Sequence, residues 1–319
     1  MRFSRRPRHG AALLLAMVIL TLVSTLAAAM VWQQRRAVQV EAAERVRAQA
    51  TWLLTGMLDF GRLILRLDAR TPGADHLGEP WATKLEEASL AGLLAQDRNN
   101  TYEGAPEAYV TGSITDAQGR YNLRNLVGGE FKIVEAELET LKRLCETASI
   151  APETANLIAT GLQAAWQAGS GDAPAATAST PLPPHQLAQL VWLGLDADTV
   201  ARLRPLVSLL PEPTPLNLNT ASREVLASVV PGLDLSSAER IVQQVQRAHF
   251  KSLEEARAYI PGNAALDPKR LGVSSNYFEV TGRLRLEGRA IEEVQLVVRR
   301  NREVVPLWRS RQVLQPSAS

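Results

Sequence analysis

The N-terminus constrains the fold of this chain more than any other segment. Four arginines lie among the first eight residues, and Gly10 separates them from an apolar stretch that runs from Ala11 to Trp32. At about 1.5 Å of rise per residue, a helix of this length spans about 33 Å, which is enough to cross a hydrocarbon core of about 30 Å. The sequence therefore predicts a transmembrane helix, and the arginines before it predict a cytoplasmic N-terminus.

The position of the cleavage site distinguishes this segment from a secretory signal peptide. Such a peptide has a shorter apolar region and is cut after it. Here the cleavage site that the sequence favours is Gly10–Ala11, before the apolar stretch. Processing there would leave the anchor on the mature protein.

The anchor continues into a longer helix. No proline occurs between Pro7 and Pro72. The spacing predicts one helix from about Ala11 to Asp68, about 85 Å long, whose second half packs one face against a soluble domain. An anchor followed by a separate helix is the alternative, but no helix breaker supports it. The predicted buried face contains Val46, Ala50, Leu53, Leu54, Met57, Leu58, Gly61 and Leu65.

The remaining pattern predicts an α+β protein with its strands at the two ends of the soluble part. A short helix is expected near Lys84–Ala95. The alternating run Tyr109–Thr115 predicts a strand, with a turn at Asp116–Gly119 and a returning strand from Arg120 to Leu123. Late strands are expected over Asn276–Leu286, Ile291–Arg300 and Glu303–Arg311. The segment from about Glu130 to Leu271 is predicted to be helical, apart from a Pro/Ala/Thr-rich loop at about 169–184 that is predicted to be disordered.

These features resemble a known family. A basic leader, Gly10 at the cut and an apolar mature N-terminus are similar to a type IV prepilin. Most pilins and pseudopilins carry glutamate at the fifth mature position, whereas this chain has Leu15. With that absence, the inserted helical domain and the segment Gly112–Leu126, the chain is identified as a member of the minor pseudopilin K family of type II secretion, general secretion pathway protein K.

The resemblance implies a division of the chain. Residues 1–10 would be the prepilin leader, 11–32 the transmembrane part of the long helix and 33–69 its periplasmic part. The first part of a pilin-like α/β domain with an antiparallel sheet would cover 70–129. An inserted all-helical domain with helix-hairpin-helix-like segments would cover 130–271, and 272–319 would complete the sheet.

The resemblance also implies a function. Prepilin peptidase would cut after Gly10 and methylate Ala11. The protein would span the inner membrane once, with its globular part in the periplasm. Minor pseudopilins I and J, the rest of the pseudopilus and the secreted proteins are the expected partners. Leu15 cannot neutralise the N-terminal amine of a neighbouring subunit, and the inserted domain would obstruct stacking. Both features imply a place at the filament tip, and no enzymatic activity is expected.

A helix-hairpin-helix-like segment offers a different function. Val225, Leu226 and Val229 are the expected buried positions of its first helix, Pro231-Gly232-Leu233 forms the hairpin, and Ser236 with Glu239 reads as a capping box. Phosphate binding needs a second glycine where this chain has Asp234, whose carboxylate would repel the anion. We therefore expect no nucleic-acid partner. The alternatives are a membrane-anchored DNA-uptake protein and an anchored periplasmic structural protein of unrelated function.

Other chemistry is sparse. The net charge of +2 does not favour a general nucleic-acid surface, and the single Cys145 lies at helical apolar spacing, as expected of a core side chain. Calcium is the one cofactor that the resemblance suggests. Two oxygen-rich turns contain Asp116, Asn122 and Asn125, and Asp267 and Asn276. Neither matches a recognised calcium loop, so no metal site is assigned and no catalytic residue is expected.

Overall fold

The computed structural model describes residues 9–71, 73–89, 108–169, 181–260, 266–286 and 289–314. The chain divides into two compact units, Met1–Thr55 and Gly56–Ser319. Helix α1 is His9–Asp68, so its C-terminal part belongs to the second unit. The predicted uninterrupted helix is therefore confirmed. The predicted disordered loop at 169–184 lies mostly outside the described residues.

The first unit contains the apolar part of α1. One 18-residue window of the helix has a mean hydropathy of 2.5 with none of it buried, so its length and composition suit a membrane span. Two of its hydroxyl groups find partners within the helix itself. Thr21 Oγ1 donates to the Val18 carbonyl and Thr25 Oγ1 to the Leu22 carbonyl, each at 2.9 Å. This internal bonding is what an apolar environment demands of a polar side chain.

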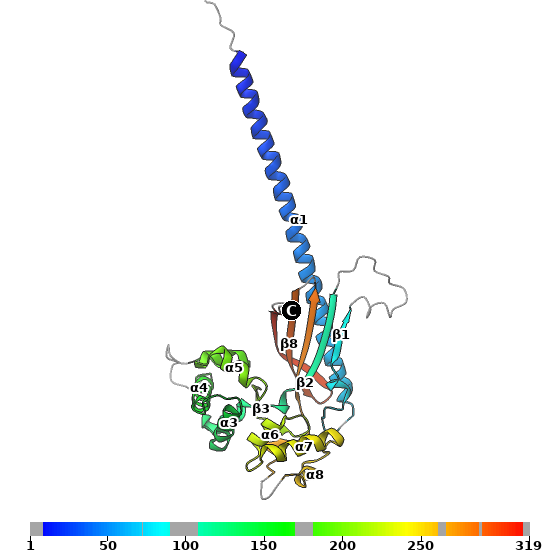
Figure 1. The fold of residues 1–319 in the computed structure, drawn as a ribbon, viewed down its shortest axis with the longest axis vertical. Coiled ribbons are helices and arrows are strands. Elements are labelled where there is room, and N and C mark those ends of the chain that lie inside the picture. The colour runs from blue at the N-terminus through cyan, green and yellow to red at the C-terminus, as the bar shows by residue number, and fades with distance from the viewer. Residues whose placement is uncertain are drawn as a thin grey trace, which may run out of the picture. The chain divides into compact units, whose positions relative to one another are not determined.

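A five-stranded antiparallel sheet forms part of the second unit, with the order β1-β2-β7-β8-β9 (Figure 1). The predicted late strands are confirmed by β7, β8 and β9. The predicted helix near Lys84–Ala95 is wrong where the structure describes it, because pairing with β2 holds this segment extended. The strands are β1 Leu85–Ser89, β2 Ala108–Asp116, β7 Tyr277–Leu286, β8 Arg289–Arg300 and β9 Glu303–Leu314.

The predicted hairpin after β2 is also wrong. Residues Ala117–Gly119 form a 3-10 helix instead of a reversing turn. The next strand, β3 Tyr121–Asn122, pairs in parallel with β4 Val207–Ser208 and not with β2. Strand β2 pairs with β7, which follows it only after residue 276. The intervening chain is thus an insertion between two neighbouring strands.

One face of the sheet packs on α1. Leu58 and Leu65 of the helix lie in one cluster with Phe278, Val280 and other sheet residues. A Cβ atom added at Gly61 would lie only 2.4 Å from Val280 Cγ1, so this glycine permits the close approach of helix and strand. The positions Leu58, Gly61 and Leu65 were predicted to be buried, and they are.

The insertion is mainly helical (Figure 1), and it has its own apolar core. Cys145 lies in this core as predicted, and burial raises the pKa of its thiol to about 11. Two short parallel pairs, β3–β4 and β5–β6, support the helices. The helices are α3 Glu135–Thr147, α4 Glu153–Ala168, α5 Ala197–Leu203, α6 Arg223–Val229, α7 Leu235–Arg247 and α8 Leu253–Arg257; β5 is Leu216–Asn217, β6 is Leu271–Gly272, and the further 3-10 helices are Pro80–Ala82, Leu123–Leu126, Gly129–Phe131 and Leu187–Leu193.

The insertion also covers part of the opposite sheet face. Ala117 and Leu210 cluster with Tyr277, Leu296 and Val298. Tyr277 pairs with Val298, whereas the next pair, Phe278 and Val297, faces α1. Because successive strand residues point to opposite faces, this end of the sheet is buried on both sides.

Candidate functional site

The residues predicted to govern processing and filament position lie on α1. Gly10 and Ala11 fall at the start of the helix, and Leu15 follows in its apolar part with 63% of its surface exposed. Leucine offers no hydrogen-bond acceptor to a neighbouring chain. The structure thus places an apolar side chain at the position where a carboxylate is expected in most pilins.

The hairpin residue Asp234 performs a structural role. It is the N-cap of α7, and its carboxylate accepts hydrogen bonds from Ser237 N at 2.7 Å and Ser236 Oγ at 2.6 Å. The predicted capping box headed by Ser236 is therefore wrong, since an aspartate two residues earlier caps the helix. Hydrogen bonding by Ser236 and Ser237 lowers the pKa of Asp234, so the helix N-terminus already carries an anion where a phosphate would bind.

Basic side chains beside the hairpin are held within the protein. Arg223 forms ion pairs with Glu224 at 2.7 Å and Glu239 at 3.1 Å. Arg240 Nη2 donates to Ser237 Oγ at 2.8 Å. Together with Asp234, these contacts favour a packing role for the hairpin. The site on which the DNA-uptake alternative depends is electrostatically unsuited to a phosphate.

A buried polar junction joins the insertion to the sheet. The carboxylate of Asp116, at the end of β2, accepts from Gln118 N at 2.7 Å and Asn217 Nδ2 at 2.9 Å. It also accepts from Thr220 Oγ1 and Ser275 Oγ, each at 2.6 Å. Burial raises the pKa of Asp116, while these bonds oppose that rise. The Asp116 side chain thus joins three segments. These are the chain that leaves the sheet after β2, the segment that contains Asn217 and Thr220, and the chain that returns to the sheet at Ser275.

Arg299 extends this junction to the end of α1. Its Nη1 lies 2.5 Å from Asp68 Oδ2, and its Nη2 lies 2.6 Å from Asp75 Oδ1. Asp75 Oδ2 accepts from Ser275 N at 2.7 Å, and the Asp75 carbonyl accepts from Asn217 Nδ2 at 3.1 Å. One guanidinium therefore fastens the end of the helix and the following loop to β8.

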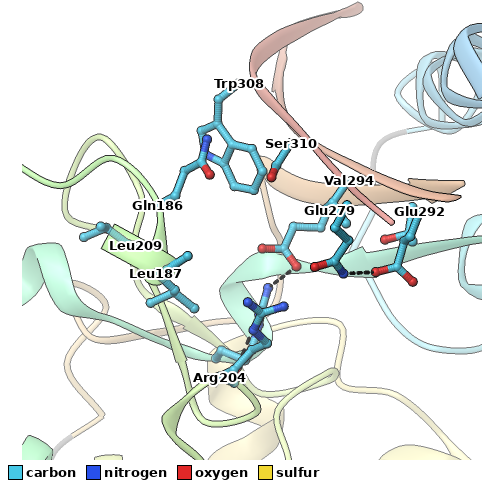
Figure 2. A pocket seen from close by; sticks show the side chains of 13 residues that line it. Gln186, Leu187, Arg204, Leu209, Glu279, Glu292, Val294, Trp308 and Ser310 are labelled. Atoms are coloured by element: carbon cyan, nitrogen blue, oxygen red, sulfur yellow. Dashed lines mark hydrogen bonds and ion pairs between the residues drawn. The ribbon is translucent and has the colours of Figure 1, made fainter. Parts of the chain in front are cut away.

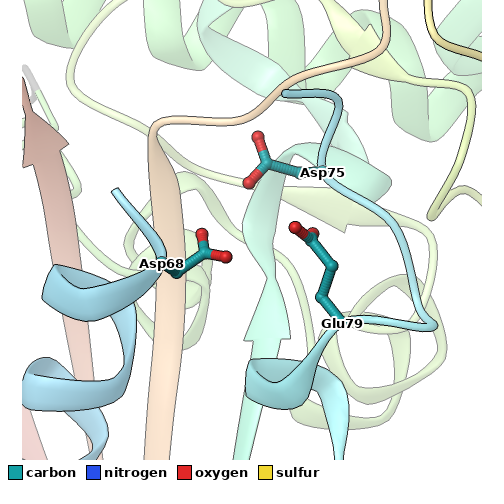
Figure 3. Close-up of side chains that lie close together, drawn as sticks. All are labelled: Asp68, Asp75 and Glu79. Carbon is teal, nitrogen blue, oxygen red and sulfur yellow. The ribbon is translucent and has the colours of Figure 1, made fainter. Parts of the chain in front are cut away.

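Three carboxylates at this point invite a test for a metal site. Asp68, Asp75 and Glu79 project toward one another (Figure 3), with oxygens within 4.8 Å. Burial and Glu79 raise the pKa of Asp68 to about 6. Arg299 already contacts Asp68 and Asp75, and Glu79 Oε2 accepts from Trp81 Nε1 at 2.8 Å. A calcium ion would have to displace the guanidinium, so these residues do not fit a calcium cage in this arrangement.

The oxygen-rich turns singled out in the sequence have other roles. Asn122 Oδ1 accepts from Arg124 N at 3.0 Å and Leu210 N at 3.1 Å. Asn125 Oδ1 accepts from Thr214 N at 3.0 Å, and Asp267 Oδ1 accepts from Lys269 N at 2.9 Å. These oxygens fix backbone geometry, which is the ordinary use of Asp and Asn in turns.

A groove of about 280 Å³ lies between the insertion and the outer sheet face (Figure 2). Trp308 overhangs it in Figure 2, and the lining residues Arg120 and Glu279 form an ion pair at 2.7 Å. Glu292 accepts from Gln312 Nε2 at 2.6 Å and pairs with Arg283 at 2.7 Å. Its lining contains no histidine or cysteine among the described residues, and its carboxylates are paired. The groove therefore lacks a nucleophile with a poised base.

An apolar stripe on α1 was missed by the sequence analysis. Phe60, Leu63 and Leu67 are 60%, 44% and 49% exposed, although Leu58 and Leu65 of the same helix are fully buried. Their i, i+3, i+7 spacing puts them on one side of the helix. Apolar residues at helical spacing outside the predicted buried face were the available signal. An exposed apolar stripe is typical of a surface that meets another protein.

Comparisons with known proteins agree with this architecture. Two family models, each described as "Type II secretion system (T2SS), protein K", match residues 119–212 and 216–274. The Type II secretion system protein K of Pseudomonas aeruginosa is 28% identical over 312 residues, covering 89% of this chain and 87% of that protein. The protein K of Pectobacterium carotovorum subsp. carotovorum is 27% identical over 309 residues, covering 88% and 90%.

A solved structure has the same fold. One chain of the crystal structure of the GspK–GspI–GspJ complex from the enterotoxigenic Escherichia coli Type 2 Secretion System matches with a TM-score of 0.60. At 18% identity, the match covers 85% of this chain and 98% of that chain. Both family models fall in the insertion, and the alignments with the two relatives cover far more of the chain than the insertion alone. Over most of its length, the chain is therefore similar to type II secretion system protein K.

Proposed function

We propose that this protein is the minor pseudopilin at the tip of the type II secretion pseudopilus. There it would initiate or cap assembly with minor pseudopilins I and J, for export of folded proteins across the outer membrane. The observation that carries this proposal is the insertion of a helical domain between the paired strands β2 and β7 of a sheet packed on α1. A pilin-like subunit with this added bulk suits the end of a filament better than its shaft.

The apolar character of Leu15 supports the same position. In pilin filaments, the glutamate at the fifth mature position is thought to neutralise the N-terminal amine of a neighbouring subunit. An unpaired charge in that apolar helical core costs several kcal/mol. Because Leu15 cannot accept this bond, the protein would not hold a neighbour in the usual way. A subunit that begins or ends the filament does not need to neutralise the amine of a neighbour in this way.

The role is structural and not enzymatic. The groove beside Trp308 offers paired carboxylates, and Cys145 is a buried thiol whose pKa is raised by its surroundings. The protein would instead act through its surfaces, with the N-terminal helix in the inner membrane and the globular part in the periplasm. The exported proteins are further partners for that part.

We expect prepilin peptidase to cleave the protein after Gly10. Mass spectrometry of the membrane form should find Ala11 at the N-terminus, with the added mass of one methyl group. Gly10→Val should retain the leader, because a branched side chain would occupy the place of the glycine in the peptidase site. Gly56→Ala is the matched control on the same helix, where an added Cβ meets no atom within 4 Å, and it should be processed normally. An unprocessed wild-type protein would contradict the assignment.

We also expect the exposed stripe of Phe60, Leu63 and Leu67 to bind partner subunits. Phe60→Glu and Leu63→Glu should each weaken co-assembly with pseudopilins I and J by about tenfold or more, since a buried charge replaces an apolar contact. The fold should tolerate both changes because these side chains are exposed. Arg47→Glu is the control for a charge change elsewhere on the helix, because Arg47 is exposed and lies well before the stripe. Co-purification and dissociation constants measure the effect, and unchanged binding in both stripe variants would refute this interface.

A further inference from the structure

Two histidines from distant parts of the chain are stacked on each other. The rings of His76 and His249 lie 3.6 Å apart between centroids, with 8° between their planes. His76 lies in the loop between α1 and the 3-10 helix Pro80–Ala82, and His249 follows α7 of the insertion. The stack therefore connects the end of the long helix with the helical domain, beyond the buried junction of Asp116 and Arg299.

The hydrogen bond at His76 requires a neutral ring. Gly78 N donates to His76 Nδ1 at 3.1 Å, so this nitrogen must present its lone pair. A proton on Nδ1 would place one N–H against another and remove the bond. Burial and the neighbouring His249 both lower the pKa of His76, whereas Glu79 opposes them. The loop holds its conformation with His76 uncharged.

Charged groups around the stack come from both sides of it. On the loop, Glu79 Oε2 accepts from His76 N at 2.9 Å, and Asp75 is committed to Arg299 and Ser275. From the insertion, Arg247 and His249 line a pocket of about 390 Å³ together with His76. The pocket gives water and protons access to the rings. Two protonated rings at this separation would repel each other beside an arginine.

We propose that the stacked pair of His76 and His249 is a pH-sensitive latch between the loop after α1 and the inserted helical domain, closed when the His76 ring is neutral and released when it is protonated. This device goes beyond the proposed tip function. It would let acidification loosen the helical domain's hold on the loop without breaking the buried junction beneath it. Histidine is suited to this use because its ordinary pKa lies near neutrality.

The direction of the pH effect follows from the sign of the pKa change. A base whose pKa is lower in the folded protein is protonated more readily when the contact is open. The latch therefore loses stability as the pH falls from the ordinary histidine value toward the lower folded value. Asp68 acts in the opposite direction, because its folded pKa is raised to about 6 and protonation of this carboxyl stabilises the folded state.

Hydrogen exchange of the full-length protein in detergent micelles tests the latch. Amide exchange around residues 76–79, corrected for the intrinsic rate, should speed up by about tenfold or more between about pH 7.5 and about pH 5. In the double variant His76→Asn, His249→Phe, the asparagine keeps an acceptor for Gly78 and the phenylalanine keeps an aromatic partner, but neither titrates. Acidification should then leave exchange unchanged or slow it. The control His185→Asn should behave as wild type.

A second readout protects the test from a variant that fails to fold. The His76 ring in wild-type protein, followed by NMR with labelled histidine, should titrate below the ordinary value of 6.5 and move upward in His249→Phe. Acid-accelerated exchange that persists in the double variant would overturn the latch. So would a His76 pKa at or above the ordinary value. Either failure would leave the tip function untouched, because that function depends on Leu15 and the insertion.

Discussion

Replacing Arg299 by methionine is expected to lower the free energy of unfolding by about 3–5 kcal/mol. The guanidinium is the shared partner of Asp68 and Asp75, whose side chains are only 14% and 3% exposed. It also lies 5.1 Å from the ring centre of Phe278. Removing it leaves two carboxylates close together in a poorly solvated site, where their mutual repulsion adds to the cost of burial.

The effect can be measured by urea unfolding followed by tryptophan fluorescence, since Trp81 is buried against Phe278 in the core under α1. Arg302→Met is the matched control, because Arg302 lies exposed in the turn between β8 and β9. Its change should stay within about 0.5 kcal/mol. A loss below about 1 kcal/mol for Arg299→Met would mean that the junction does not fasten the end of α1 as described.

Local sequence patterns predicted the long elements well. The proline-free run before Pro72 predicted α1, and the alternation of Val294, Leu296 and Val298 predicted β8. Both patterns repeat over many residues, so neighbouring contacts cannot easily overrule them. The segment Leu85–Ser89 was mispredicted because its pairing with β2, and not its own composition, makes it a strand.

The prediction of a hairpin turn after β2 was wrong for a related reason. Asp116 through Gly119 has the composition of a hairpin turn, but Asp116 binds residues about a hundred positions away, Asn217 and Thr220. No local pattern reveals such contacts. The cap of α7 was misplaced by a smaller margin, because Asp234 and Ser236 are both good capping residues and only geometry chooses between them.

The candidate sites likewise divide into those that a local motif reveals and those that only tertiary contacts reveal. Leu15 and Asp234 were found from motifs, since each is a departure from an expected residue at a fixed position. The meeting of Asp75, Asp116 and Arg299, and the stack of His76 on His249, depend on tertiary folding across the insertion. The sequence pattern marked Asp116 only as a possible calcium ligand in a turn, and it gave no sign of the contacts that the other residues make.

Removing the insertion is expected to convert the protein from a filament end to a subunit that allows further stacking. Asp116 and Phe278 face each other in the sheet, so a short glycine-containing turn can replace residues 118–274 without displacing β2 or β7. The shortened protein should keep its sheet, as judged by circular dichroism, and overproduced pseudopili should be longer than with the wild-type protein. Unchanged filament length with a folded variant would contradict an obstructing role.

Leu15→Glu separates the two features that support the tip position. The new carboxylate would satisfy a neighbour's amine, but the insertion would still obstruct stacking. This variant should therefore leave exoprotein release unchanged or reduce it. Secretion should never require a glutamate at position 15. Combining Leu15→Glu with the deletion should lengthen filaments more than the deletion alone, because both obstacles are then removed.

The position of the protein in the assembled pseudopilus tests the central claim most directly. A small epitope inserted after Leu314, beyond β9, can be labelled with gold on isolated filaments whose secretion activity is intact. The tip assignment predicts gold at one end of each filament. Gold distributed along the shaft would contradict it.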